Sequence, residues 1–300
     1  MKPMEEIIRS LCPPMAPLPA GMEARLDPLP GVRAVLFDVY GTLFVSGSGD
    51  VGTAAATDSA EAMAQALGAV SNSGAVEQAG ERGRQLLQAA VLEAHAAARA
   101  AGVDYPEVDI EAIWKQVIEQ LGASRLAAIP GTGPETIRRL ALEYECRVNP
   151  VWPMPGALET IQTLKERGLV LGIVSNAQFY TPLLFPAFFS QTIEELGFDP
   201  ACCVWSYRER RGKPSAMLFP KAVGVLEAQY GIGPEETVYV GNDMLNDIHT
   251  AEQARCRTVL FAGDQRSLRL RENDERCSNL EPDAVITALS QLCSLIQGAC

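Results

Sequence analysis

Short apolar runs alternate with helix-patterned stretches through the second half of the chain, and this alternation restricts the fold most. The apolar runs are Leu169–Val174, Cys202–Trp205, Thr237–Val240 and Arg257–Phe261, and the helical stretches include Ala157–Arg167, Ser215–Tyr230 and Met244–Arg255. Strands that alternate with helices at this spacing form βαβ units, in which the strands are parallel and helices cover the sheet. The sequence therefore predicts an α/β fold built on a parallel sheet.

One further apolar run lies far upstream of the others. Ala34–Phe37 is followed directly by Asp38, and we assign it to the same sheet. Between this run and the rest, apolar residues recur at helical spacing in residues 75–101, 110–121 and 137–144, without strand-like alternation. We therefore expect residues 49–149 to form an all-α insertion, and residues 31–48 and 150–300 to form the α/β core.

Two segments carry residues that favour turns and irregular structure. Residues 1–30 contain seven prolines, which predicts an irregular leader that wraps the core or trails from it. Residues 45–57 are rich in Gly, Ser and Ala, which predicts a linker into the helical insertion.

The charge and the cysteine pattern narrow the class of protein. A formal net charge of −12 and a pI near 4.8 argue against nucleic acid or an anionic membrane surface as a partner. The sequence MKPMEEIIRSLCPP lacks the apolar core of a signal peptide, and no run approaches the ~20 apolar residues of a membrane span. The eight cysteines form no CxxC motif and are expected to be free thiols. We expect a cytoplasmic protein, monomeric or homodimeric, that acts on a small molecule.

Polar clusters fall where the predicted strands end or in the loops that follow them. They are Asp38 with Gly41-Thr42, the pair Ser175-Asn176, Lys213 in RRGKPS, and GNDMLND at 241–247. Ligands of an open parallel sheet bind beyond the carboxyl ends of its strands. We therefore expect these clusters to meet in one site.

The ordered combination of these clusters resembles the haloacid dehalogenase (HAD) superfamily of hydrolases. The resemblance extends from about residue 31 to about 290 and includes LFDVYGTL, PMPGALETIQTLKERGLVLGIVSN and PDAVITAL. It implies a HAD-like Rossmannoid parallel sheet flanked by helices, with the helical insertion as a cap domain after the first motif. It also implies a hydrolase that uses an aspartate nucleophile.

The resemblance assigns a role to each cluster. Asp38 would be the nucleophile that forms a covalent ester with the substrate, and Thr42 belongs to the same motif. Ser175, followed by Asn176, would hydrogen-bond the transferring phosphoryl oxygen. Lys213 would neutralise charge beside it, although Arg208, Arg210 and Arg211 are rival cations nearby.

The acidic loop is expected to hold Mg²⁺. This ion prefers hard oxygen ligands in octahedral geometry. Asp38, the backbone carbonyl of Tyr40 and Asp243 would be ligands, and Asp247 would anchor them from behind. Asn242, not an aspartate, directly follows Gly241, so the loop residue that reaches the metal stays open.

Tyr40 departs from the superfamily's phosphatases, which carry a second aspartate two residues after the nucleophile as an acid and base. A phenol with an ordinary pKa of about 10 is a poor base near neutrality, although it can donate a proton. Two enzymatic interpretations follow: a Mg²⁺-dependent phosphatase acting on a small phosphorylated metabolite, and a 2-haloacid dehalogenase, whose halide leaves without a proton.

Each interpretation has support in the sequence. FDVYGTL looks more like the first motif of the dehalogenases, but these place a halide-binding arginine downstream, and no arginine occurs between Arg33 and Arg82. The acidic loop favours a metal-dependent phosphatase, which we prefer, with a good leaving group or a proton donor from the cap as compensation for Tyr40. The third alternative is a non-catalytic binding protein with this fold. His95 and His249 are expected to be a helix-surface residue and a helix-packing residue, not catalysts.

Overall fold

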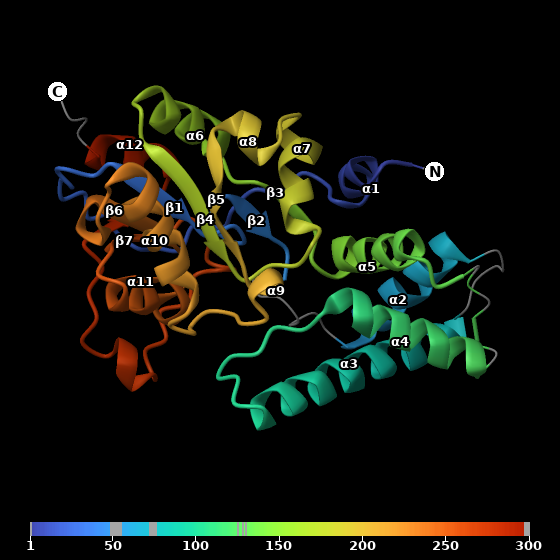
Figure 1. Ribbon diagram of the computed structural model, residues 1–300. Coiled ribbons are helices and arrows are strands. Elements are labelled where there is room, and N and C mark those ends of the chain that lie inside the picture. The colour runs from blue at the N-terminus through green and yellow to red at the C-terminus, as the bar shows by residue number, and fades with distance from the viewer. Residues whose placement is uncertain are drawn as a thin grey trace.

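The α/β core is built on a parallel six-stranded sheet (Figure 1). The computed structural model describes residues 2–48, 56–71, 77–124, 126, 127, 129 and 131–296. The strand order is β5-β4-β1-β6-β7-β8. The strands are β1 (Ala34–Phe37), β4 (Val170–Ser175), β5 (Phe198–Trp205), β6 (Thr237–Gly241), β7 (Arg257–Phe261) and β8 (Ala284–Ile286). The predicted α/β fold class is confirmed, and β8 is a strand that the sequence reading missed.

Alternating side chains of the central strand enter two hydrophobic clusters, one on each face of the sheet. Ala34 and Leu36 pack with α10 (Leu218–Tyr230), whereas Val35 and Phe37 pack with α6 (Ala157–Glu166). All four side chains are fully buried. Successive side chains of a strand point to opposite faces, so an uninterrupted apolar run is required where both faces are covered.

The helical insertion forms a separate layer beside the sheet (Figure 1). It consists of α2 (Ala56–Val70), α3 (Glu77–Ala100), α4 (Ile110–Ala123) and α5 (Pro134–Val148). The apolar side chains of these helices pack together in a separate hydrophobic cluster, which contains Met63, Trp114 and Leu140. This agrees with the helical cap that the family resemblance implied.

A short antiparallel pair, which the sequence reading missed, stands at the two junctions between core and cap. β2 (Phe44–Ser46) pairs with β3 (Val151–Pro153). The predicted linker at 45–57 is therefore wrong at both ends, because Val45 lies in a strand and Ala56 begins a helix. Residues 49–55 of that prediction lie outside the described residues.

Two further predictions need correction. Residues 4–11 of the leader are not irregular but form α1 (Met4–Leu11), because Ile7 and Ile8 bury an apolar stripe against the core. The helix predicted at 244–255 is a π-helix, η3 (Met244–His249), that continues into α11 (Thr250–Gln253).

The remaining short helices lie in connections between these elements. They are η1 (Thr181–Leu183), α7 (Leu184–Phe189), α8 (Ile193–Leu196), α9 (Ser206–Glu209), η2 (Pro234–Glu236), η4 (Glu275–Cys277), η5 (Leu289–Gln291) and α12 (Leu292–Leu295). Across the described part of the chain, no helix combines the length and apolarity that a bilayer crossing requires. The cysteines in that part are free thiols.

Candidate active site

The carboxyl ends of the central strands bring Asp38, Ser175 and Lys213 together. Asp38 follows β1, and Ser175 ends the neighbouring strand β4. Ser175 Oγ donates to Asp38 Oδ1 at 2.8 Å, and Lys213 Nζ donates to the same oxygen at 2.8 Å. Because both bonds end on Oδ1, these two donors leave Oδ2 of Asp38 to a substrate or a metal.

Lys213 is a buried cation between two carboxylates. Its Nζ lies 2.5 Å from Asp247 Oδ1 and 2.8 Å from the hydroxyl of Tyr239. Burial favours the neutral amine, but the charges of Asp247 and Asp38 outweigh it and raise the pKa of Lys213. Burial also raises the pKa of Asp247 to about 6, although Lys213 opposes this shift. One charged lysine therefore compensates the carboxylate of Asp38, while Asp247 holds its proton more tightly.

Asp247 also fixes the loop that follows β6. Its Oδ2 accepts hydrogen bonds of 2.9 Å from the backbone N–H groups of Asn242 and Asp243. A Cβ on Gly241 would lie 2.4 Å from Cγ of Asp247, so this close approach requires glycine. The geometry places Asp247 behind the lysine and the loop, as an anchor of both.

Asp243 is already surrounded by donors. Its carboxylate accepts from the N–H groups of Leu245 and Asn246 at 2.9 and 3.1 Å and caps the π-helix. It also forms an ion pair of 2.5 Å with Arg271, from the loop after β7. Sequence reasoning missed Arg271, because its approach to Asp243 depends on the path of that loop.

Thr42 and Asn242 connect the first motif to the acidic loop. Thr42 Oγ1 donates to Asn242 Oδ1 at 3.2 Å, and Asn242 Nδ2 donates to the carbonyl oxygen of Ser267 at 2.5 Å. Gly41 has φ +79°, and a Cβ there would lie 2.4 Å from Cβ of Ser267. These contacts connect the loop after Asp38 to the acidic loop and to Ser267.

Tyr40 is hydrogen-bonded to the segment that follows β4. Its hydroxyl lies 2.9 Å from Thr181 Oγ1 at the start of η1. Burial, reinforced by the nearby charge of Glu145, raises the pKa of Tyr40 well above its ordinary value. The phenol therefore keeps its proton near neutrality and cannot serve as a base there.

Asn176 holds the backbone of the lysine loop. Its Oδ1 accepts from the N–H of Lys213 at 2.6 Å, and its Nδ2 donates to the carbonyl oxygen of Lys213 at 3.1 Å. The rival cations turn elsewhere: Arg208 lies over the ring of Tyr207, Arg210 pairs with Asp109, and Arg211 pairs with Asp104. Lys213 is thus the cation at Asp38.

The α3–α4 loop, residues 101–109, is bonded to the same lysine loop. The carbonyl oxygen of Tyr105 accepts from the N–H of Gly212 at 2.8 Å, and Ser215 Oγ donates to Asp104 at 2.9 Å. Glu107 accepts from Ser206 Oγ at 2.8 Å. The cap is therefore fastened to the segment that positions Lys213.

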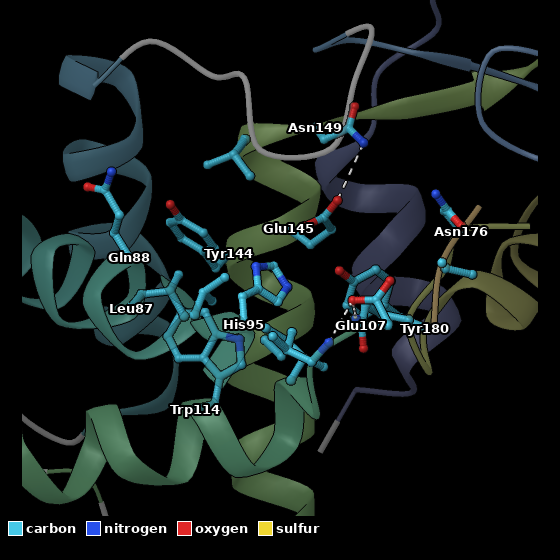
Figure 2. A pocket seen from close by; sticks show the side chains of 18 of the residues that line it. Leu87, Gln88, His95, Glu107, Trp114, Tyr144, Glu145, Asn149, Asn176 and Tyr180 are labelled. Carbon is cyan, nitrogen blue, oxygen red and sulfur yellow. Dashed lines mark hydrogen bonds between the residues drawn. The ribbon is translucent and has the colours of Figure 1, made fainter. Parts of the chain in front are cut away.

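A cavity of about 700 Å³ lies between cap and core (Figure 2). From the core it is lined by Tyr40, Asn176, Tyr180 and Lys213, and from the cap by Leu87, Gln88, His95, Glu107, Trp114, Tyr144 and Glu145. His95, which we expected to lie on a helix surface, is half-buried on α3 and lines this cavity. Nothing in its spacing along the chain distinguished it.

The described residues contain no cluster of three or more His, Cys, Asp or Glu side chains that could hold a metal. The donor types suit Mg²⁺, since carboxylate and carbonyl oxygens are its ligands. Asp243 would have to give up its ion pair with Arg271 to bind the ion. Ser267 Oγ is buried without a hydrogen-bond partner in the described structure, beside Gly41 and Asn242. A water molecule or a hydrated ion would satisfy it.

Known proteins resemble this chain in sequence and in fold. Ribulose-1,5-bisphosphate 5-phosphatase from Halopiger xanaduensis is 26% identical over 48% of this chain and 56% of its own length. Glyceraldehyde 3-phosphate phosphatase from Pyrococcus furiosus is 28% identical over 54% of this chain and 67% of its own length. The crystal structure of 2-haloacid dehalogenase from Pseudomonas syringae pv. Tomato DC3000 superposes with a TM-score of 0.50 at 19% identity, covering 88% of this chain and 97% of that one, which shows a shared fold.

A family match covers most of the chain. The model of haloacid dehalogenase-like hydrolases matches residues 32–255, which include the motif around Asp38, the helical insertion, the lysine loop and the acidic loop. The chain belongs to the haloacid dehalogenase-like hydrolases.

Proposed function

We propose that this hydrolase cleaves the phosphate ester of a small phosphorylated metabolite through an aspartyl-phosphate intermediate on Asp38. The observation that carries the proposal is the pair of donors on Asp38 Oδ1, from Ser175 and Lys213. They fix the carboxylate and leave Oδ2 to attack phosphorus. The curated relatives named above are both phosphatases of small sugar phosphates by name, which supports the same substrate class.

The chain's own residues divide the work in two half-reactions. Asp38 Oδ2 attacks phosphorus and displaces the alcohol, and water then cleaves the aspartyl phosphate. Ser175 and Lys213 bind the charge that builds on the phosphoryl oxygens, a form of electrostatic stabilisation that needs fixed donors. Asp247 and Asn176 hold Lys213 in place, through its side chain and its backbone respectively. The helical insertion, residues 49–149, would act as the cap that selects the substrate.

Mg²⁺ is the proposed cofactor. Asp38, the carbonyl of Tyr40 and Asp243 would hold it, with Asp247 behind the loop. When bound, the ion would neutralise charge on the phosphoryl oxygens. The ion pair between Asp243 and Arg271 opposes this role, since the carboxylate cannot serve both cations fully.

A second candidate is 2-haloacid dehalogenation. Two observations favour it: the phenol of Tyr40 supplies no base, and Arg271 already neutralises Asp243. Halide departure needs neither a proton nor a metal. The carbon atom that carried the halide would then be joined to Asp38 as a carboxylic ester.

One experiment separates these functions. Phosphate release from a panel of sugar phosphates and chloride release from 2-chloropropionate are measured with Mg²⁺ and with EDTA. For a phosphatase we expect Mg²⁺-stimulated phosphate release, a phosphorylated Asp38 in mass spectra of quenched enzyme, and loss of both in Asp38→Asn. Metal-independent chloride release would support the dehalogenase instead. Asp199→Asn, a change at the start of β5 and outside the site, is the matched control and should leave the rate unaltered.

A further inference from the structure

The α3–α4 loop of the cap pairs with the lysine loop of the core through its backbone. The N–H of Glu107 donates to the carbonyl oxygen of Arg210 at 3.1 Å, and the N–H of Gly212 donates to the carbonyl oxygen of Tyr105 at 2.8 Å. These two bonds flank an antiparallel bridge between the loops. The pairing ends next to Lys213, because Gly212 directly precedes it. The backbone of the cap therefore supports the segment that carries the lysine.

The side chain of Glu107 reaches a second segment of the core, the β4 turn, which we define as residues 175–178. Its carboxylate accepts from Nε2 of Gln178 at 2.9 Å and from Oγ of Ser206 at 2.8 Å. Ser206 Oγ in turn accepts from the N–H of Ala177 at 2.8 Å. The side chains of Ser206 and Gln178 are buried. These bonds therefore join the cap to the β4 turn inside the contact between cap and core.

The β4 turn and the lysine loop carry the two donors to the proposed nucleophile. Ser175 begins the turn, Lys213 lies in the loop, and each donates to Asp38 Oδ1 at 2.8 Å. Asn176 joins the two segments, since its side chain bonds the N–H and the carbonyl oxygen of Lys213. Glu107 contacts both segments, the loop through its backbone and the turn through its side chain.

Two ion pairs on the same cap loop are weaker candidates for this support. Arg210 pairs with Asp109, and Arg211 pairs with Asp104, but the four side chains are 33–52% exposed. Exposed pairs of this kind contribute little to stability. The carboxylate of Glu107 instead binds a buried hydroxyl and a buried amide, and its removal would leave these groups unsatisfied. Glu107 is therefore the side chain of this loop on which docking depends most.

We propose that Glu107 is a positioning residue, which holds the β4 turn and the lysine loop in the arrangement that presents Ser175 and Lys213 to Asp38; this inference rests on the proposed function. Glu107 also lines the cavity (Figure 2), but in this role it transfers no proton. The two donors are correctly placed only when the α3–α4 loop lies against the core. The cap thus takes part in assembling the site that it covers.

Kinetics of Glu107→Ala with 4-nitrophenyl phosphate and Mg²⁺ test this role. We expect kcat to fall on the order of 10²-fold, which is the cost of misplacing reacting groups by about 1 Å. KM should change less than kcat, because Ser175 and Lys213 act on charge that builds up in the transition state. A loss confined to KM would overturn the positioning role.

Glu107→Gln separates positioning from proton transfer. Its amide oxygen can accept from Gln178, and its amide N–H can donate to Ser206 Oγ, whose proton then turns to the carbonyl oxygen of Ala177, 3.1 Å away. We therefore expect kcat to stay within about fivefold of the wild-type value. A loss in Glu107→Gln as large as in Glu107→Ala would mean that the charge or the proton of Glu107 matters, and the proposal would be wrong.

Amide hydrogen exchange measures the two segments without any turnover. In Glu107→Ala the N–H groups of Gly212 and Ala177 should exchange faster, by about tenfold, because their bonds to the cap loop and to Ser206 open more often. Glu107→Gln should exchange as wild type does. Unchanged exchange in Glu107→Ala would overturn the proposal. If Glu107→Ala does not fold, Ser206→Ala breaks the same link from the core side and is read in the same way.

Asp109→Asn is the matched control on the same loop. It removes the exposed ion pair with Arg210 but keeps a side chain that can cap α4 at the N–H of Ala112. It should behave as wild type in kinetics and in exchange. A loss as large as that of Glu107→Ala would show that Glu107 has no special role. If Asp38→Asn still hydrolyses the ester, the proposed function fails, whereas hydrogen exchange still decides the role of Glu107.

Discussion

The two walls of the cavity hold their polar side chains in different ways. On the core wall, the side chain of Lys213 is only 3% exposed. Short hydrogen bonds join its Nζ to Asp38, Asp247 and Tyr239. On the cap wall, Glu145 has a long bond of 3.4 Å to Asn149 and a bond to Tyr180. The difference teaches that the core wall holds its carboxylates by charge, around a buried lysine, whereas this carboxyl group of the cap is held by neutral donors.

Lys213→Met should have the largest effect on the core wall. It leaves the buried carboxylates Asp38 and Asp247 without their cation, and breaking a buried ion pair in this way costs about 3–5 kcal/mol. We expect that loss in the free energy of unfolding from urea titration, together with loss of hydrolysis. Lys221→Met, at an exposed lysine, is the control and should change the unfolding free energy little. Equal stability of the two variants would show that the core wall is not held by this cation.

Gly41→Ala tests the tight turn that follows Asp38. The positive φ alone costs an alanine about 1–2 kcal/mol, and the new Cβ would also lie 2.4 Å from Cβ of Ser267. Gly31→Ala is a matched control, since Gly31 has φ +75° with nothing within 4 Å. We expect thermal unfolding to show a larger loss for Gly41→Ala, and only this variant to lose activity. Similar losses would mean that Ser267 and Asn242 yield without disturbing Asp38.

Arg271→Ala examines the acidic loop at the edge of the core wall. Removing the guanidinium frees Asp243 for a divalent cation, so binding of Mn²⁺ should tighten, by up to about fivefold for a partly exposed ion pair worth about 1 kcal/mol. Isothermal titration with Mn²⁺ measures this directly, without any turnover. Arg276→Ala removes an exposed arginine that pairs with Asp274 and should leave the affinity unaltered. Weaker binding after Arg271→Ala would place the metal away from Asp243.

The cap wall should show the smallest effect on stability, through pH. Because the folded-state pKa of Glu145 is raised, its contribution to stability is fully present below the pKa of the unfolded chain and is lost as the pH rises through the folded-state pKa. Glu145→Gln removes this dependence. The difference in unfolding free energy between variant and wild type should therefore shift in favour of the variant from pH 4 to pH 8. A constant difference would mean that Glu145 titrates as an exposed glutamate does.

The sequence predicted the part of the site that depends on strands. Apolar runs that require burial on both faces predict parallel strands, so Asp38 and Ser175 lie together at the carboxyl ends of neighbouring strands. Lys213 meets them there. The contact of Arg271 with Asp243 could not be predicted in this way. It depends on a loop whose course is fixed by backbone bonds, from Met244 N–H to Arg269 and from Arg269 N–H to Asn242.

The cap shows the same limit from another side. The helices α3, α4 and α5 were predictable, because apolar residues recur at helical spacing in each of them. Periodicity does not say which polar residues of a helix face a neighbouring layer, so His95 and Glu145 looked like any other helical side chains. The strands β2 and β3 are three residues each, too short for an alternating pattern to be recognised.

The bonds between the α3–α4 loop and the lysine loop have a consequence for the position of Lys213. The carbonyl oxygen of Tyr105 accepts from the N–H of Gly212, and Asp104 accepts from Ser215 Oγ, so the cap is bonded on both sides of Lys213. A movement of the cap away from the core would break both contacts and remove this support from the loop that carries the lysine. The cap thereby contributes to holding the cation beside Asp38, in addition to lining the cavity.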